Sequence, residues 1–93
     1  MDWKPYDPTW LVALAREQHP DMPWLADALA ACARAAWESR AYVYFVDPAE
    51  ANQPGAAWQF DENVVLEHPQ EGEIVLDLLR GQRVGGAEFL KHL

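Results

Sequence analysis

The chain has 93 residues, of which 51% are hydrophobic, and it carries a formal net charge of −8 at pH 7. This length suits one domain held together by its own core, since the lone Cys32 cannot form an intramolecular disulfide. The acidic balance argues against direct nucleic-acid binding, and no segment has the length and apolar character of a membrane span.

Two helices that begin at prolines are predicted in the first half of the chain. The first runs from about Pro8 to His19, with Asp7 as its N-cap and proline at the first helical position. The second runs from Pro23 to about Ser39, because its alanine-rich sequence has a high helix propensity. Cys32 falls on the apolar face of this second helix, so we expect a buried and unreactive thiol.

A strand and a loop are predicted next. Residues 41–46 are aromatic, β-branched and continuously apolar, which predicts a central strand buried on both faces. Residues 47–56 contain two prolines and are expected to form a long loop. Tyr42 and Tyr44 share one face of the strand. They pack in the core, or they form an interaction hot spot if no helix covers that face.

The rest of the chain predicts antiparallel strands separated by turns. These strands are expected at residues 58–60, 64–67, 74–79 and 83–90, with turns at 61–63, 68–72 and 80–82. The first two segments could instead form one bulged strand. Gly85-Gly86 leaves open a short terminal helix from Ala87 in place of the last strand, because paired glycines weaken a strand.

These elements predict one α+β domain over residues 1–93. Its two N-terminal helices pack on an antiparallel meander of four to five strands and cover one face of that sheet. The acidic half of the sequence coincides with the sheet, so carboxylates are expected on the loops and on the uncovered face.

The whole net charge of the chain lies in its middle. No lysine or arginine occurs between Arg40 and Arg80, and outside residues 41–79 seven acidic residues balance seven basic ones. We expect the eight carboxylates inside this stretch to form one contiguous surface that binds a positively charged protein, unless the charge serves only solubility. These carboxylates belong to Asp47, Glu50, Asp61, Glu62, Glu67, Glu71, Glu73 and Asp77.

Residues for catalysis or metal binding show no recognisable pattern. The possible nitrogen and sulfur ligands His19, Cys32, His68 and His92 are scattered along the chain. Ser39 is the only serine and lacks the motif of a nucleophile. The glycines do not form a phosphate-binding loop. We therefore expect a protein that is not an enzyme and uses neither metal nor cofactor.

Residues 61–90, DENVVLEHPQEGEIVLDLLRGQRVGGAEFL, combined with the acidic profile, resemble small bacterial immunity proteins of toxin/immunity systems, including those of contact-dependent inhibition. The lone cysteine and the lack of a secretory signal or membrane span predict a cytoplasmic location. The resemblance implies a non-enzymatic inhibitor that binds a basic toxin, with a nuclease domain as the expected target. Such a protein covers the active site of the toxin or a neighbouring surface.

Two alternatives to an immunity protein stay open. One is a phage-type nucleic-acid mimic that inhibits a defence nuclease. The other is a homodimeric structural or regulatory domain whose charge serves solubility.

Overall fold

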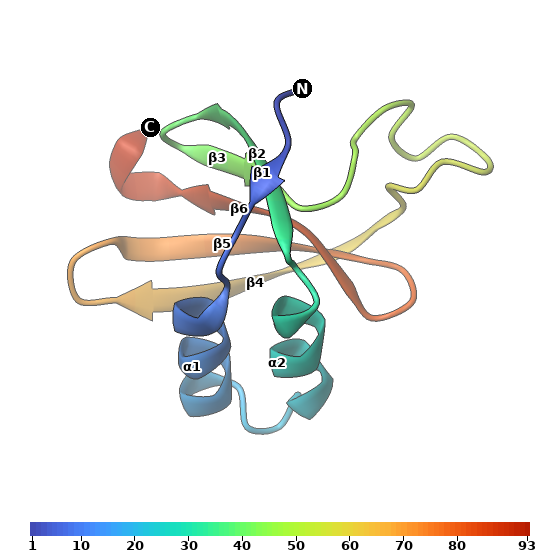
Figure 1. Cartoon of the computed structure of the whole chain (residues 1–93). Helices are drawn as coiled ribbons and strands as arrows, with labels where there is room; N and C mark the ends of the chain where they lie inside the picture. The colour runs from blue at the N-terminus through green and yellow to red at the C-terminus, as the bar shows by residue number, and fades with distance from the viewer.

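The computed structural model describes residues 1–93 and has an α+β architecture with two α-helices and six strands (Figure 1). The strands form one antiparallel sheet in the order β1-β2-β3-β6-β5-β4. In chain order the elements are β1 (Lys4–Pro5), α1 (Thr9–Gln18), α2 (Pro23–Ala30), β2 (Arg34–Ser39), β3 (Tyr42–Tyr44), β4 (Phe60–His68), β5 (Gly72–Leu79), β6 (Arg83–Phe89) and the short 3-10 helix η1 (Leu90–His92).

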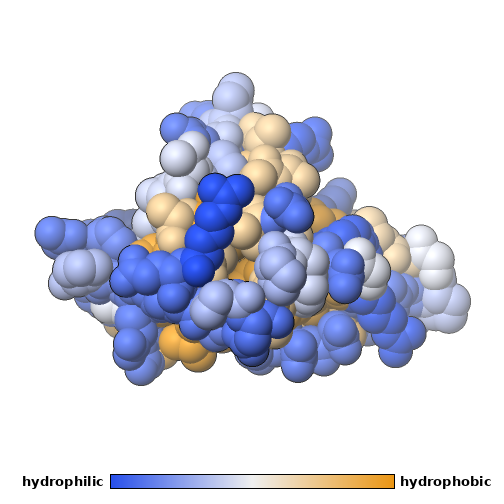
Figure 2. Space-filling view, turned by 90° about the horizontal axis from the view of Figure 1, so that it is seen from below, coloured by the Kyte–Doolittle hydropathy of each residue, from blue (hydrophilic) through white to orange (hydrophobic).

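The two helices lie side by side on one face of the sheet (Figure 1). α1 contacts β4 and α2 contacts β6. The core lies between these layers, and its fully buried side chains come from both, such as Leu11 and Leu29 of the helices and Leu66 and Leu76 of the strands. Seen from the helix side, hydrophilic residues cover most of the surface (Figure 2). Neither helix has the length and apolar character needed to cross a membrane.

The opposite face of the sheet has no helix over it, and we call it the outer face. Side chains alternate between the two faces along each strand, so the neighbours of buried, core-facing residues point outward. Its central residues are Tyr42 and Tyr44 of β3, Val75 and Asp77 of β5, and Glu88 of β6.

The first helix starts one residue later than predicted, with Pro8 in place of Asp7 at the N-cap position and Thr9 as the first helical residue. Asp7 Oδ1 accepts hydrogen bonds from the Thr9 backbone N–H at 3.0 Å and from the Thr9 hydroxyl at 2.6 Å. These two bonds hold the pKa of the exposed Asp7 carboxyl below its usual value, the hydroxyl bond contributing most. The helix ends at Gln18, ahead of the proline that disfavours its continuation.

The predicted second helix is wrong over its second half. α2 ends at Ala30, and residues 34–39 form strand β2 instead. This strand pairs with β3 across a tight turn and with β1 on its other side. The helix propensity of alanine exceeds that of glycine by only about 1 kcal/mol per residue. The pairing of this segment with β1 and β3 outweighs that preference. Together with β1 this change raises the strand count from the predicted four to five to six.

β3 lies inside the sheet, as predicted, but it is shorter and less buried than predicted. The structure assigns only Tyr42–Tyr44 to this strand, between β2 and β6. Val43 is fully buried against the helix layer, whereas both tyrosines are half-buried on the outer face. The expectation of burial on both faces is therefore wrong, because the helices cover only one of them.

The remaining strands settle two alternatives left open by the sequence. β4 is one continuous strand with a register irregularity between Phe60 and Glu62, so the bulged strand forms and the turn at residues 61–63 does not. β6 continues as a strand to Phe89, so no helix begins at Ala87. Hairpin turns join β4 to β5 and β5 to β6 where they were predicted.

The glycine pair in β6 is explained by close packing. A Cβ on Gly86 would lie 2.6 Å from the Val43 carbonyl oxygen and 2.7 Å from the Tyr42 hydroxyl oxygen. A Cβ on Gly85 would lie 2.7 Å from the Trp58 ring, which the long loop carries. Glycine therefore lets β3 and two aromatic rings approach the strand closely.

The exposed edge of β4 is covered by side chains from the end of α1. The Gln18 amide donates to the Glu67 carbonyl oxygen at 2.7 Å and accepts from the Glu67 N–H at 2.8 Å. A nitrogen of the His19 ring lies 2.8 Å from the Val65 carbonyl oxygen. These bonds occupy backbone groups that an edge strand would otherwise offer to another chain.

Candidate functional site

Cross-strand pairing aligns two rows of residues on the outer face. Neither row contains a lysine or an arginine. One row crosses the sheet through Asn63, Asp77, Gly86 and Tyr44. The next row crosses it through Val65, Val75, Glu88 and Tyr42.

The two tyrosines are the centre of a hydrogen-bonded group. Their rings pack with centroids 4.6 Å apart. The Tyr42 hydroxyl donates to Asp77 Oδ2, and the Asn63 amide donates to Asp77 Oδ1 at 2.7 Å. The Tyr44 hydroxyl donates to Glu38 Oε2 at 3.0 Å. These contacts fix the orientation of both phenol rings on the face that carries no helix.

Both phenols remain hydrogen-bond donors at neutral pH. Burial raises the pKa of Tyr42, and the bond to Asp77 raises it further. Burial is also the main cause that raises the pKa of Tyr44, followed by its bond to Glu38. The outer face therefore combines protonated tyrosines with carboxylates in direct contact.

The eight predicted carboxylates do not form one contiguous surface. Strand alternation separates them, since residues 67, 73 and 77 share the outer face whereas residue 62 shares the side of the buried Val64 and Leu66. Glu71 lies in the β4–β5 turn and faces a pocket on the helix side. Asp47 and Glu50 lie in the long loop, and Asp61 lies at the irregularity of β4.

None of these carboxylates is neutralised by lysine or arginine. The ion pairs of the structure are Lys4–Asp2 at 3.5 Å, and Glu71 with the His92 ring at 3.1 Å. The outer face therefore retains its negative charge even though the predicted surface is divided.

Glu38 and Glu88 join the outer face although they lie outside the cation-free stretch. Glu38 was assigned to a helix by the sequence, and its position on β2 emerges only once that segment is a strand. Glu88 pairs across the sheet with Tyr42 and Val75. The alternation of tyrosines in β3 is the sequence signal that identified this face.

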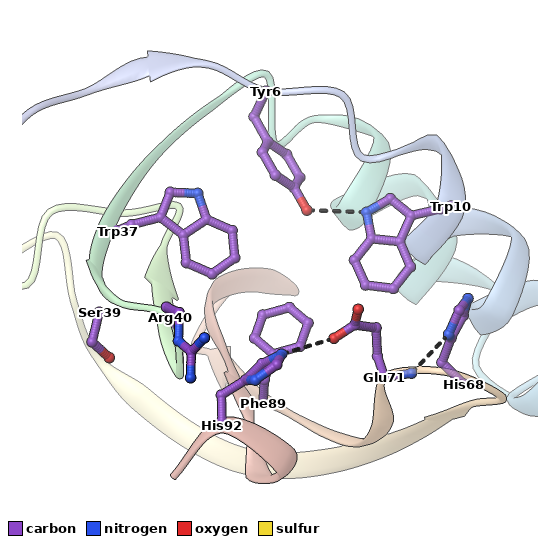
Figure 3. Close-up of a pocket in the computed structure, with 9 residues that line it drawn as sticks. All are labelled: Tyr6, Trp10, Trp37, Ser39, Arg40, His68, Glu71, Phe89 and His92. Carbon is purple, nitrogen blue, oxygen red and sulfur yellow. Dashed lines mark hydrogen bonds and ion pairs between the residues drawn. The ribbon is translucent and has the colours of Figure 1, made fainter.

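A pocket of about 730 Å³ lies on the helix side, away from the outer face (Figure 3). Segments far apart in the sequence meet there, from the N-terminal stretch to η1. Its aromatic residues are Tyr6, Trp10, Trp37 and Phe89. Its polar residues are Ser39, Arg40, His68, Glu71 and His92.

The aromatic rings of the pocket are held by one another. Phe89, only 3% exposed, stacks at 6.1 Å on Trp10 and at 5.6 Å on Trp37. Trp10 Nε1 donates to the Tyr6 hydroxyl oxygen at 3.1 Å. Trp37 is 51% exposed and forms the solvent side of the pocket. A large exposed indole beside a concave surface is typical of a binding site.

The polar groups are also oriented by hydrogen bonds. Glu71 Oε2 lies 3.1 Å from His92 Nε2. His68 Nδ1 accepts from the backbone N–H groups of Gln70 at 3.2 Å and Glu71 at 3.1 Å. We assign the proton of the neutral His68 ring to Nε2 from these two bonds.

The isolated cysteine belongs to the core. Cys32 is 8% exposed, and its thiol donates to the Ala28 carbonyl oxygen at 3.4 Å. Burial raises its pKa to about 12, so the thiol stays protonated and unreactive at neutral pH. It lies just after α2 and not on the predicted helix face. No cluster of three histidine, cysteine or acidic side chains is arranged to hold a metal ion.

Comparison with protein-family models, curated proteins and solved structures gave no match to this chain. The function is therefore inferred from the residues of the outer face and of the pocket.

Proposed function

We propose that the protein is a non-enzymatic inhibitor that binds a basic protein domain through its outer face. Immunity proteins of bacterial toxin systems are non-enzymatic inhibitors that bind a toxin domain. We propose a toxin nuclease domain as the target of this protein, in the bacterial cytoplasm. The observation that carries the proposal is the pair Tyr42 and Tyr44, flanked by Glu38, Asp77 and Glu88 without a neighbouring cation.

The composition of the outer face matches that of an interface centre. Tyrosine is enriched at hot spots because it offers a large apolar ring and a polar tip. The rings of Tyr42 and Tyr44 are already fixed by contact with each other and by carboxylates, so binding costs little side-chain entropy. The surrounding carboxylates attract arginine and lysine of a partner during approach.

The alternatives fit this face less well. A homodimer that used the outer face would place like charges opposite each other across its two-fold axis. A nucleic-acid mimic needs carboxylates that are free to imitate phosphates, whereas Asp77 and Glu38 accept hydrogen bonds from tyrosines within the protein. The contacts therefore favour a protein partner recognised by aromatic and acidic groups together.

The test is capture of the partner from a lysate of the native host. We expect the wild-type protein to retain a basic protein at low salt, to release it as salt rises, and to inhibit its nuclease activity. A bait with Glu38, Glu73 and Glu88 replaced by lysine serves as the control and should not retain it. An acidic partner, or a partner retained equally by the control bait, would contradict the proposal.

A further inference from the structure

We propose that the helix-side pocket binds a small ligand with a methylated ammonium group, of the kind found in choline. The pocket lies on the opposite side of the sheet from the outer face, so this site is independent of the proposed partner surface. Its four aromatic side chains come from four different segments and surround an open centre (Figure 3).

The arrangement of the rings suits a bulky cation. Tyr6, Trp10, Trp37 and Phe89 lie on different sides of the cavity (Figure 3). Phe89 stacks on both indoles at interplanar angles of 23° and 29°, and this packing fixes Trp10 and Trp37 at the wall of the cavity. Ring faces attract cations through their quadrupole, and sites of this kind recognise quaternary ammonium groups. Methyl groups on the nitrogen also make the ligand cheaper to desolvate than a primary ammonium ion.

Glu71 supplies the negative charge that a cationic ligand requires. Its side chain reaches between Trp10 and Phe89 into the pocket (Figure 3). Oε2 contacts His92, which leaves Oε1 without a partner in the protein. The net charge of −8 further favours a cation over an anion.

Arg40 is the one lysine or arginine that lines the pocket, and it is exposed. Its charge is therefore screened by water and salt, whereas the carboxylate of Glu71 is half-buried among the rings. The volume of about 730 Å³ lies within the range of small-molecule sites and exceeds the size of one trimethylammonium head. The natural ligand should consequently extend beyond that head.

The first test compares choline with its uncharged isostere, 3,3-dimethylbutan-1-ol, by calorimetric titration of the whole chain. We expect choline to bind at least about tenfold more tightly, since the two differ in charge and hardly in shape. Equal affinities for choline and the uncharged alcohol would overturn the proposal, because the pocket would then select only for apolar shape. Absence of choline binding up to about 10 mM would overturn the proposal.

Variants locate the site. Trp37→Ala and Glu71→Gln should each weaken choline binding about tenfold, and both replace residues that are not fully buried. Glu73→Gln, on the outer face of the same hairpin, is the matched control and should leave binding unchanged. Arg40→Gln should preserve or strengthen choline binding, because it removes a positive charge from the pocket lining. Indole-3-acetate, an aromatic carboxylate, tests the opposite charge preference. If it binds where choline does not, and Arg40→Gln abolishes its binding, the pocket is not a cation site.

Discussion

Replacing Glu38, Glu73 and Glu88 with lysine should slow association with the basic partner by about 100-fold at low salt. All three side chains belong to the outer face, and none is fully buried. The reversal changes the net charge from −8 to −2, since each of three sites gains two charges. Long-range attraction is lost, and the new ammonium groups repel the partner. Stopped-flow measurements over a series of salt concentrations give the rates.

The control is a second triple reversal with the same change in net charge. Glu17, Asp21 and Asp27 are exposed on the helix side, away from the outer face. Their replacement by lysine should slow association only a few-fold, because distant charges are screened over about 10 Å at 0.1 M salt. If both triple variants slow association equally, total charge governs binding and the outer face has no special role.

Gly86→Ala should lower the free energy of unfolding by about 2–4 kcal/mol. The added methyl group would lie 2.6 Å from the Val43 carbonyl oxygen, which belongs to the backbone of a paired strand and cannot rotate away. It would also displace Tyr42 from its bond with Asp77. Chemical denaturation followed by tryptophan fluorescence measures the loss.

Gly55→Ala is the comparison for this substitution. No atom lies within 4 Å of the new methyl group there, so only the positive φ of +84° is unfavourable. We expect a loss of roughly 1 kcal/mol. A Gly86→Ala protein that unfolds within about 0.5 kcal/mol of the wild type would show that β3 and β6 are not packed this closely.

Much of the fold was predictable where local chemistry decides it. The start of α1, predicted to within one residue, the strand over residues 74–79 and the two hairpin turns follow from helix-start residues, alternation and turn residues. Residues 34–39 were not predictable in this way. Their alanines favour a helix locally, and they become a strand only because β1 and β3 pair with them.

The candidate site was predictable in part. The alternating Tyr42 and Tyr44 indicated a face that could become a hot spot, and the cation-free stretch indicated its charge. Counting carboxylates along the chain could not show that Glu71 would face the helix side while Glu73 faces outward. The pocket gave no local signal, since Tyr6, Trp37 and Phe89 lie far apart in the sequence.

The most direct test of the outer face as the binding surface uses the three tyrosines of the chain as probes. The protein labelled with 3-fluorotyrosine gives one ¹⁹F signal each from Tyr6, Tyr42 and Tyr44. Tyr6 lies in the helix-side pocket and serves as the internal control. Titration with the basic partner should shift or broaden the signals of Tyr42 and Tyr44 and leave that of Tyr6 in place. A change confined to Tyr6 would contradict binding through the outer face.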